Sequence, residues 1–110
     1  MESLSIRDVI EFSTERRIRK ALFKAPHLIC EMVCYEPGQG TAMHQHPRQD
    51  EMFYIIEGKG TITVEDETIV AGPGKLVMVP AQKRHGFQAA EDSRWVMMFI
   101  KGPGTSIFDK

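Results

Sequence analysis

Residues 38–58, GQGTAMHQHPRQDEMFYIIEG, carry the most informative pattern in the chain. His44 and His46 are separated by one residue, so on an extended strand both imidazoles point to the same face. Residues 47–50 are long enough for a hairpin connection, and an antiparallel strand that begins near Glu51 brings its carboxylate beside the two rings. The stretch therefore predicts two antiparallel strands that present three potential metal ligands at one point.

A fourth ligand has to come from elsewhere in the sequence, and His85 is the strongest candidate. It follows a turn that contains Pro80 and opens another short apolar run. Burying three imidazoles and a carboxylate together without a cation would cost several kcal/mol unless every group found a polar partner, so the set favours a bound metal ion. The remaining histidine, His27, is expected to be an exposed turn residue.

Length and composition set limits on the molecule. The chain has 110 residues, 42% of them hydrophobic and 26% charged, which is enough for one domain, 1–110, and too few for two. The formal charge of −1 argues against nucleic acid or an acidic membrane as a partner. The sequence shows neither a secretory pattern nor an apolar stretch of ~20 residues, so a cytoplasmic location is expected. Cys30 and Cys34 are too far apart along a strand to form a disulfide, and we expect them to be reduced.

Nine short runs rich in β-branched or aromatic residues are separated by turn-forming glycines and prolines. The predicted strands cover residues 18–23, 28–35, 41–46, 51–57, 60–64, 68–70, 76–79, 86–89 and 95–100. Many short strands at near-regular spacing are typical of a β-sandwich or a β-barrel. Before the first strand, Ser5 and Asp8 resemble a capping box, which predicts one or two helical turns within residues 6–12.

Two motifs in this sequence resemble the conserved motifs of the cupin family. The matching residues are Gly38, His44, His46, Glu51 and Gly58 in the first motif, and Gly74, Pro80 and His85 in the second. Two positions depart from the family pattern, since Gln82 stands where a glycine is usual and Ala89 where an asparagine is usual. The resemblance covers about residues 38–89. It implies a small single-domain cupin of the cupin 2 type, an all-β jelly-roll barrel or double-stranded β-helix with at most a short N-terminal helix.

The resemblance also implies a metal site formed by His44, His46, Glu51 and His85. Three imidazoles and a carboxylate suit one divalent transition metal ion, namely iron, manganese, nickel, cobalt, copper or zinc, better than calcium or magnesium. An octahedral ion would keep two open positions for a small oxygen-rich molecule, a property that cupin dioxygenases, isomerases and decarboxylases exploit. We therefore expect a metal-dependent dioxygenase, lyase or isomerase that acts on a small oxygenated organic acid or phenol. The alternative is a non-catalytic module that binds or senses a small molecule.

Strand alternation predicts the surroundings of the ligands, because residues two apart on a strand share a face. An outward Glu31 would turn Cys34 inward, where it would either pack in the core or reach the pocket. The predicted pocket-lining residues are Cys34, Ala42, Gln49, Phe53 and Phe87. The polar candidates for substrate contact, for which an exposed loop position is the simpler interpretation, are Gln49, Asp50, Gln82 and Arg84. The sequence identifies no catalytic acid or base.

Two further patterns concern the outer surface. Strand alternation places the basic residues within 16–24 on both strand faces or along a solvated edge, and the simpler interpretation is an edge that deters pairing with other chains. Strands 51–56 and 95–100 are apolar on both faces, so one face needs a cover outside the barrel. Either the N-terminal segment or a partner subunit can supply this cover, and we expect a homodimer.

Overall fold

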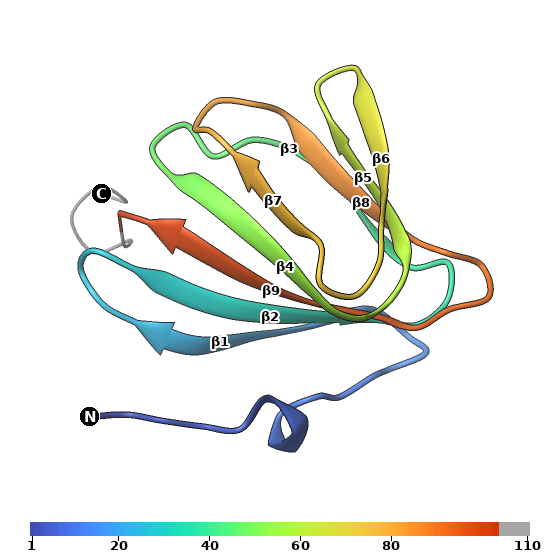
Figure 1. The fold of residues 1–110 in the computed structure, drawn as a ribbon, viewed down its shortest axis with the longest axis horizontal. Helices are drawn as coiled ribbons and strands as arrows, with labels where there is room; N and C mark the ends of the chain where they lie inside the picture. The colour runs from blue at the N-terminus through green and yellow to red at the C-terminus, as the bar shows by residue number, and fades with distance from the viewer. Residues whose placement is uncertain (104–110) are drawn as a thin grey trace.

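The computed structural model describes residues 1–103 and shows two facing antiparallel sheets (Figure 1). Residues 104–110, the end of the predicted domain, lie outside the described residues. The elements in chain order are the 3₁₀ helix η1 (Ile6–Asp8) and the strands β1 (Ile18–Lys24), β2 (Ile29–Tyr35), β3 (Gly40–His44), β4 (Asp50–Gly58), β5 (Gly60–Val64), β6 (Glu67–Ala71), β7 (Leu76–Val79), β8 (His85–Ala89) and β9 (Trp95–Gly102). Every predicted strand is present, and no strand end differs from its prediction by more than about two residues.

The connectivity between the two sheets is that of a jelly roll. The first sheet has the strand order β1-β2-β9-β4-β7, and the second has the order β3-β8-β5-β6. Neighbours such as β2 and β9, or β3 and β8, lie far apart in the sequence and next to each other in space (Figure 1). This arrangement confirms the prediction of an all-β jelly-roll barrel.

The main hydrophobic core fills one end of the space between the sheets. Trp95 on β9 packs against Tyr35 on β2 with ring centroids 5.5 Å apart, and its Nε1 donates a hydrogen bond to the Ala71 carbonyl oxygen at 3.1 Å. Gly58 ends β4 at this position with φ 75°, and a Cβ there would collide with the Arg94 carbonyl group. The glycine of the first motif is therefore required by both its backbone conformation and its close contact with β9.

A second, smaller cluster lies on the outer face of the first sheet. Met32, Cys34 and Val96 are buried there beneath apolar side chains of the N-terminal segment, among them those of Ile6 and Phe12. The N-terminal segment thus supplies the predicted cover over this part of the sheet. The predicted alternation of β2 is wrong, because Cys34 faces outward into this cluster rather than toward the space between the sheets.

The helix at the N-terminus lies within the predicted residues and has the smaller of the two predicted lengths. It is a single 3₁₀ turn, and the Ser5 side chain makes no capping hydrogen bond. The Asp8 N–H instead donates to the Ser5 carbonyl oxygen at 3.0 Å. The capping-box prediction is therefore wrong, and residues 9–12 continue as an irregular segment that packs on the sheet. Within residues 1–103 we find no helix of the length and apolarity needed to span a membrane.

Candidate metal centre

The three predicted histidines come together where β3 ends and β8 begins. His44 is the last residue of β3 and pairs across the sheet with His85, the first residue of β8, with ring centroids 4.4 Å apart. His46 lies just past the end of β3, with its ring centroid 5.1 Å from that of His44 and 5.7 Å from that of His85. One potential ligand atom from each histidine lies within 4.8 Å of the others.

Glu51 reaches the same point from the first sheet. It is the second residue of β4, and its side chain is 2% exposed. Its Oε1 lies 3.3 Å from Nε2 of His46 and 3.4 Å from Nε2 of His85. Among the described residues, neither carboxylate oxygen of Glu51 nor Nε2 of His85 has a hydrogen-bond partner, although all three atoms are buried. Buried polar atoms without partners are costly, so this donor set fits a bound cation.

Backbone carbonyl groups fix the orientation of two of the rings. Nδ1 of His44 donates a hydrogen bond to the Ala42 carbonyl oxygen at 2.8 Å, and Nδ1 of His85 donates to the Lys83 carbonyl oxygen at 2.9 Å. Because a carbonyl oxygen can only accept, the proton of each neutral ring sits on Nδ1 and Nε2 keeps its lone pair. Histidines that ligate metals commonly have this arrangement, which presents Nε2 to the ion.

Burial and neighbouring charges shift the pKa values of these groups in different directions. Burial lowers the pKa of His44 and of His46 below the ordinary histidine value. Burial acts on His85 in the same way, but the adjoining Glu51 carboxylate outweighs it and raises the pKa of His85. Burial would raise the pKa of Glu51, but the neighbouring imidazoles and Lys101 hold it below the usual glutamate value. The ionised carboxylate and the neutral rings of His44 and His46 are the forms that bind a metal ion.

A row of alternating charges crosses the first sheet beside the histidines. Arg19 on β1 contacts Glu31 on β2, with Nη2 and Oε1 3.0 Å apart. Nζ of Lys101 on β9 lies 2.9 Å from the same oxygen, and Lys101 pairs in register with Glu51 on β4. Burial would raise the pKa of Glu31, but Lys101 and Arg19 outweigh it and hold the pKa below its usual value.

Sequence reasoning missed this row of charges. It ended the last strand at residue 100 and placed Glu31 on the outer face. Every second residue of β9 faces the core, namely Trp95, Met97 and Phe99. The next residue in this alternation is Lys101, so the pattern itself places the lysine on the inner face. Extending β9 by one step of the same alternation would have found it.

A pocket of about 360 Å³ opens beside the histidines. One wall includes Ala42 and His44 on β3 and His46 in the segment that follows β3. The opposite wall includes Phe99 and Lys101 on β9. Ala42 is thus one of the residues that line this pocket, on a strand whose register shifts between Thr41 and His44. The volume is near the lower end of the range for small-molecule sites, about 300–1,000 Å³, and suits a small ligand.

The other predicted lining residues occupy different positions. Phe53 and Phe87 contact the His85 ring from the core, with centroid distances of 5.6 Å and 5.9 Å. Gln49 is buried, and its amide donates to the Pro103 carbonyl oxygen at 2.8 Å. Cys34 lies in the outer cluster, on the opposite face of β2 from the pocket. The two phenylalanines therefore support the ligands from behind, and the other two residues have structural contacts elsewhere.

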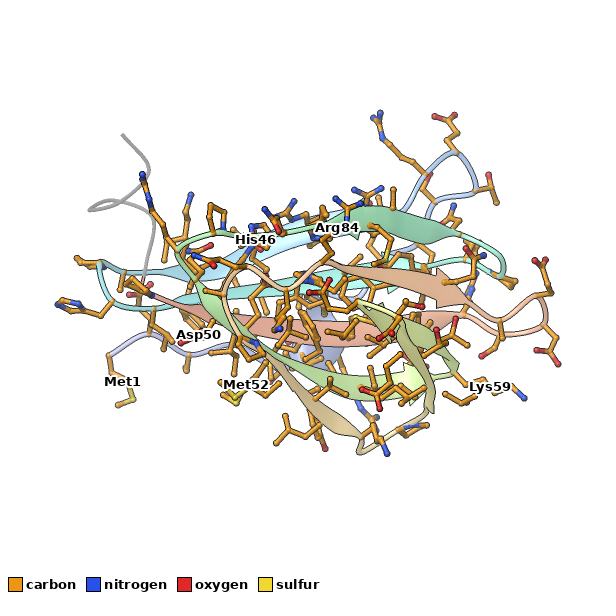
Figure 2. All side chains as sticks on the ribbon, turned by 90° about the horizontal axis from the view of Figure 1, so that it is seen from above. Met1, His46, Asp50, Met52, Lys59 and Arg84 are labelled. Carbon is orange, nitrogen blue, oxygen red and sulfur yellow. The ribbon has the colours of Figure 1, made fainter. Side chains whose placement is uncertain are left out.

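The loop candidates mainly hold the ligand-bearing segments together. Asp50 accepts a hydrogen bond from the Ala81 N–H at 2.9 Å, and the Gln82 N–H donates to the His46 carbonyl oxygen at 3.0 Å. Gln82 has φ 74°, a left-handed conformation that favours glycine, the residue usual at this position in the family pattern. Arg84 is exposed and lies on the same side of the molecule as His46, toward the top of Figure 2.

Comparisons with known proteins identify similar sequences and similar folds. A sequence profile of the cupin domain matches residues 31–101. The polyketide synthase CurC of Streptomyces cyaneus is 30% identical over 67 residues, which cover 61% of this chain and 44% of that protein. The 5-nitrosalicylic acid 1,2-dioxygenase of a Bradyrhizobium species is 28% identical over 81 residues, covering 74% of this chain and 39% of that protein. This chain thus spans less than half the length of either relative.

Solved structures show the same fold. The protein TT1209 from Thermus thermophilus superposes with a TM-score of 0.88 at 22% identity. The superposition covers 94% of this chain and 98% of the other. At this level of identity the likeness establishes the shared fold and nothing about the reaction.

Proposed function

The chain belongs to the cupin family, and from this premise we propose that it binds one divalent transition metal ion through His44, His46, Glu51 and His85 and acts as a metal-dependent enzyme. The observation that carries the proposal is a group of three histidines whose ligand atoms lie within 4.8 Å of one another, with Glu51 Oε1 within 3.4 Å of two of the ring nitrogens. The buried Glu51 oxygens and His85 Nε2 have no hydrogen-bond partner among the described residues, and a pocket opens beside them. The candidate ions are iron, manganese, nickel, cobalt, copper and zinc.

The proposed reaction is a dioxygenation, or a lyase or isomerase reaction, of a small oxygenated organic acid or phenol. The ion, when bound, would supply Lewis-acid or redox chemistry to a molecule that chelates it. The carbonyl groups of Ala42 and Lys83 hold two of the rings in place, and Phe53 and Phe87 exclude water from the inner side of the site. The relative named as a 5-nitrosalicylic acid dioxygenase supports the dioxygenase class.

Elemental analysis tests the metal site. The protein would be purified without a histidine tag or chelator, in parallel with His46→Ala and Glu51→Ala. We expect near-stoichiometric transition metal in the wild type and its loss in both variants. His27→Ala is the matched control, because His27 is exposed and lies outside the cluster. Retention of metal in His46→Ala and Glu51→Ala would refute the assignment of the ligands.

A turnover assay separates the enzyme from the alternative of a non-catalytic binding or sensing module. Metal-loaded protein would be incubated with small hydroxy acids and phenols while oxygen consumption and product formation are followed. Product formation that disappears in His46→Ala supports the enzyme. Tight binding without any product in the presence of oxygen and metal would support the binding module instead.

We also propose that the chain forms a homodimer and acts in the cytoplasm. The outer face of β4 and β7 carries four exposed apolar side chains, which the N-terminal segment leaves uncovered: Met52, Tyr54, Leu76 and Met78. Met52 pairs with Met78 across the two strands and lies on the side of the molecule away from His46, toward the bottom of Figure 2. Sedimentation should show a dimer that Met78→Glu dissociates, whereas the control Val70→Glu, at an exposed position on β6, leaves it intact. A wild-type monomer would refute the dimer.

A further inference from the structure

The wall that the first sheet and its leading segment contribute to the pocket is basic. Arg17, Arg19 and Lys101 all line the pocket that holds His44 and His46, and none of the described lining residues is acidic. Arg19 lies on β1 and Arg17 directly precedes this strand, and both side chains line the pocket. Part of the basic run within residues 16–24 is therefore directed into the site and does not serve only as a solvated edge.

The positive charges of this wall are only partly neutralised. Arg19 and Lys101 share the single carboxylate of Glu31, at 3.0 Å and 2.9 Å. Arg17 is exposed and makes no hydrogen bond or ion pair with any residue in the described part of the chain. The three cations thus outnumber the two nearby carboxylates, which are Glu31 and, next to Lys101, Glu51. The unpaired guanidinium of Arg17 remains available to an anionic ligand.

The ion pair between Lys101 and Glu31 is largely buried in the wall of the pocket. The Lys101 side chain is 6% exposed and the Glu31 side chain 13%, so both charges are held in place within the sheet. A buried lysine is rare unless it is paired, and here the partner is itself shared with a second cation, Arg19. The excess positive charge is therefore a fixed property of the pocket.

Resting on the proposed function, we infer that the substrate of this site is a carboxylate anion whose carboxylate is bound by Arg17, with Arg19 and Lys101 adding to the positive field. The planar guanidinium matches a carboxylate in a two-point interaction, whereas a neutral phenol gains little from it. The remainder of the molecule would extend toward His44 and His46 on the other wall. A pocket of about 360 Å³ favours an acid the size of one aromatic ring or smaller.

Binding of salicylate and salicylamide tests this inference. The two molecules share a ring and a phenol oxygen, but salicylate carries an anionic carboxylate where salicylamide carries a neutral carboxamide. Calorimetric titrations would be made on metal-free and metal-loaded wild type, Arg17→Gln and Arg16→Gln. Arg16 is the matched control, because it is an exposed arginine next to Arg17 and does not line the pocket.

We expect the wild type to bind salicylate about tenfold more tightly than salicylamide, the lower end of the range for a charge-assisted hydrogen bond at an exposed group. Arg17→Gln should lose this preference, and Arg16→Gln should keep it. Equal binding of the two ligands, absence of salicylate binding at millimolar concentration, or an equal loss in both variants would overturn the inference.

Metal analysis of the same samples separates this inference from the proposed function. A preference for salicylate that depends on Arg17 in protein that takes up no metal would refute the metal site and leave the carboxylate site standing. Metal uptake through the four ligands without any preference for salicylate would support the metal site and refute the carboxylate site. The wild-type fold is checked in both variants by circular dichroism, since neither arginine is buried.

Discussion

The two ends of the space between the sheets are built from the same strands and have opposite character. Along the inner face of β9, Trp95, Met97 and Phe99 belong to the apolar core, whereas Lys101 joins the row of charges beside the histidines. On β4 the order along the chain is reversed, from Glu51 at the site to Phe53 and Ile55 in the core. Strand alternation therefore decides which face a residue occupies, and its position along the strand decides whether it contributes to stability or to the site.

The largest expected effect on stability lies at the apolar end, where Trp95 is part of the core. Trp95→Ala removes a fully buried ring that packs against Tyr35 and donates to the Ala71 carbonyl oxygen. The free energy of unfolding, measured by urea titration, should fall by about 3–5 kcal/mol. Trp95→Phe keeps an aromatic ring and should lose about 1–2 kcal/mol, mostly through the unpaired Ala71 carbonyl group. If the free energy of unfolding of Trp95→Ala fell by less than about 1 kcal/mol, the apolar end would not be the main source of stability.

At the end that holds the histidines, the effect on stability should appear only when metal is added. Glu51→Gln keeps the shape of the side chain and removes the charge that a cation requires. Manganese at a concentration about 100 times its Kd should stabilise the wild type by about 2.7 kcal/mol, and the variant should lose most of this gain. Thermal unfolding with and without manganese measures the difference, and His27→Ala should respond as the wild type does. An equal response of Glu51→Gln and the wild type would show that the carboxylate is not a ligand.

The fold could be predicted from the sequence because its signals are local. Alternating apolar residues and turn-forming residues define each strand within a few positions, and all nine predicted strands are present in residues 1–103. The error in β2 came from the rule that a glutamate faces solvent. Glu31 instead lies inside because Lys101, seventy positions along the chain, and Arg19 neutralise it. No local pattern around Glu31 contains this information.

The candidate site divides in the same way. The spacing of His44 and His46 is a local signal, whereas the pairing of His44 with His85 requires β3 and β8 to be neighbours, which the residues alone do not specify. The family resemblance supplied that contact. The basic wall was missed because it forms only when Lys101 on β9 comes close to Arg17 and Arg19. This requires β9 to pair in register with β2, which happens only in the folded chain.

The row of charges predicts a pH dependence of stability. The pKa of Glu31 is lower in the folded protein than in the unfolded chain, so its ionised form stabilises the fold. This contribution is present above pH about 4.3 and is lost as the pH falls through the folded-state pKa. Glu31→Gln should therefore cost about 2 kcal/mol at pH 7 and much less near pH 3, as measured by urea unfolding.

A surface pair provides the control for this experiment. Glu65 lies 3.9 Å from Lys83 with both side chains about half exposed. Glu65→Gln should cost less than about 0.5 kcal/mol at either pH, because exposed ion pairs are screened by water. If Glu31→Gln had the same cost at both pH values, its carboxylate would not be held ionised by its neighbours.

The smallest expected effect concerns the turn between β7 and β8, which holds the His46 segment through a backbone hydrogen bond. Gln82 adopts a left-handed conformation with φ 74°, which costs a residue with a Cβ roughly 1 kcal/mol, while its N–H holds the His46 carbonyl group at 3.0 Å. Gln82→Gly relieves the strain but gives the unfolded chain more freedom, so the net gain should be below about 0.5 kcal/mol. Gln82→Val adds a β-branched side chain at the same φ and should lose about 1 kcal/mol. Both variants keep the N–H, so both should retain the wild-type metal content. A loss of metal in Gln82→Gly would show that the side chain, and not the backbone of this turn, positions His46.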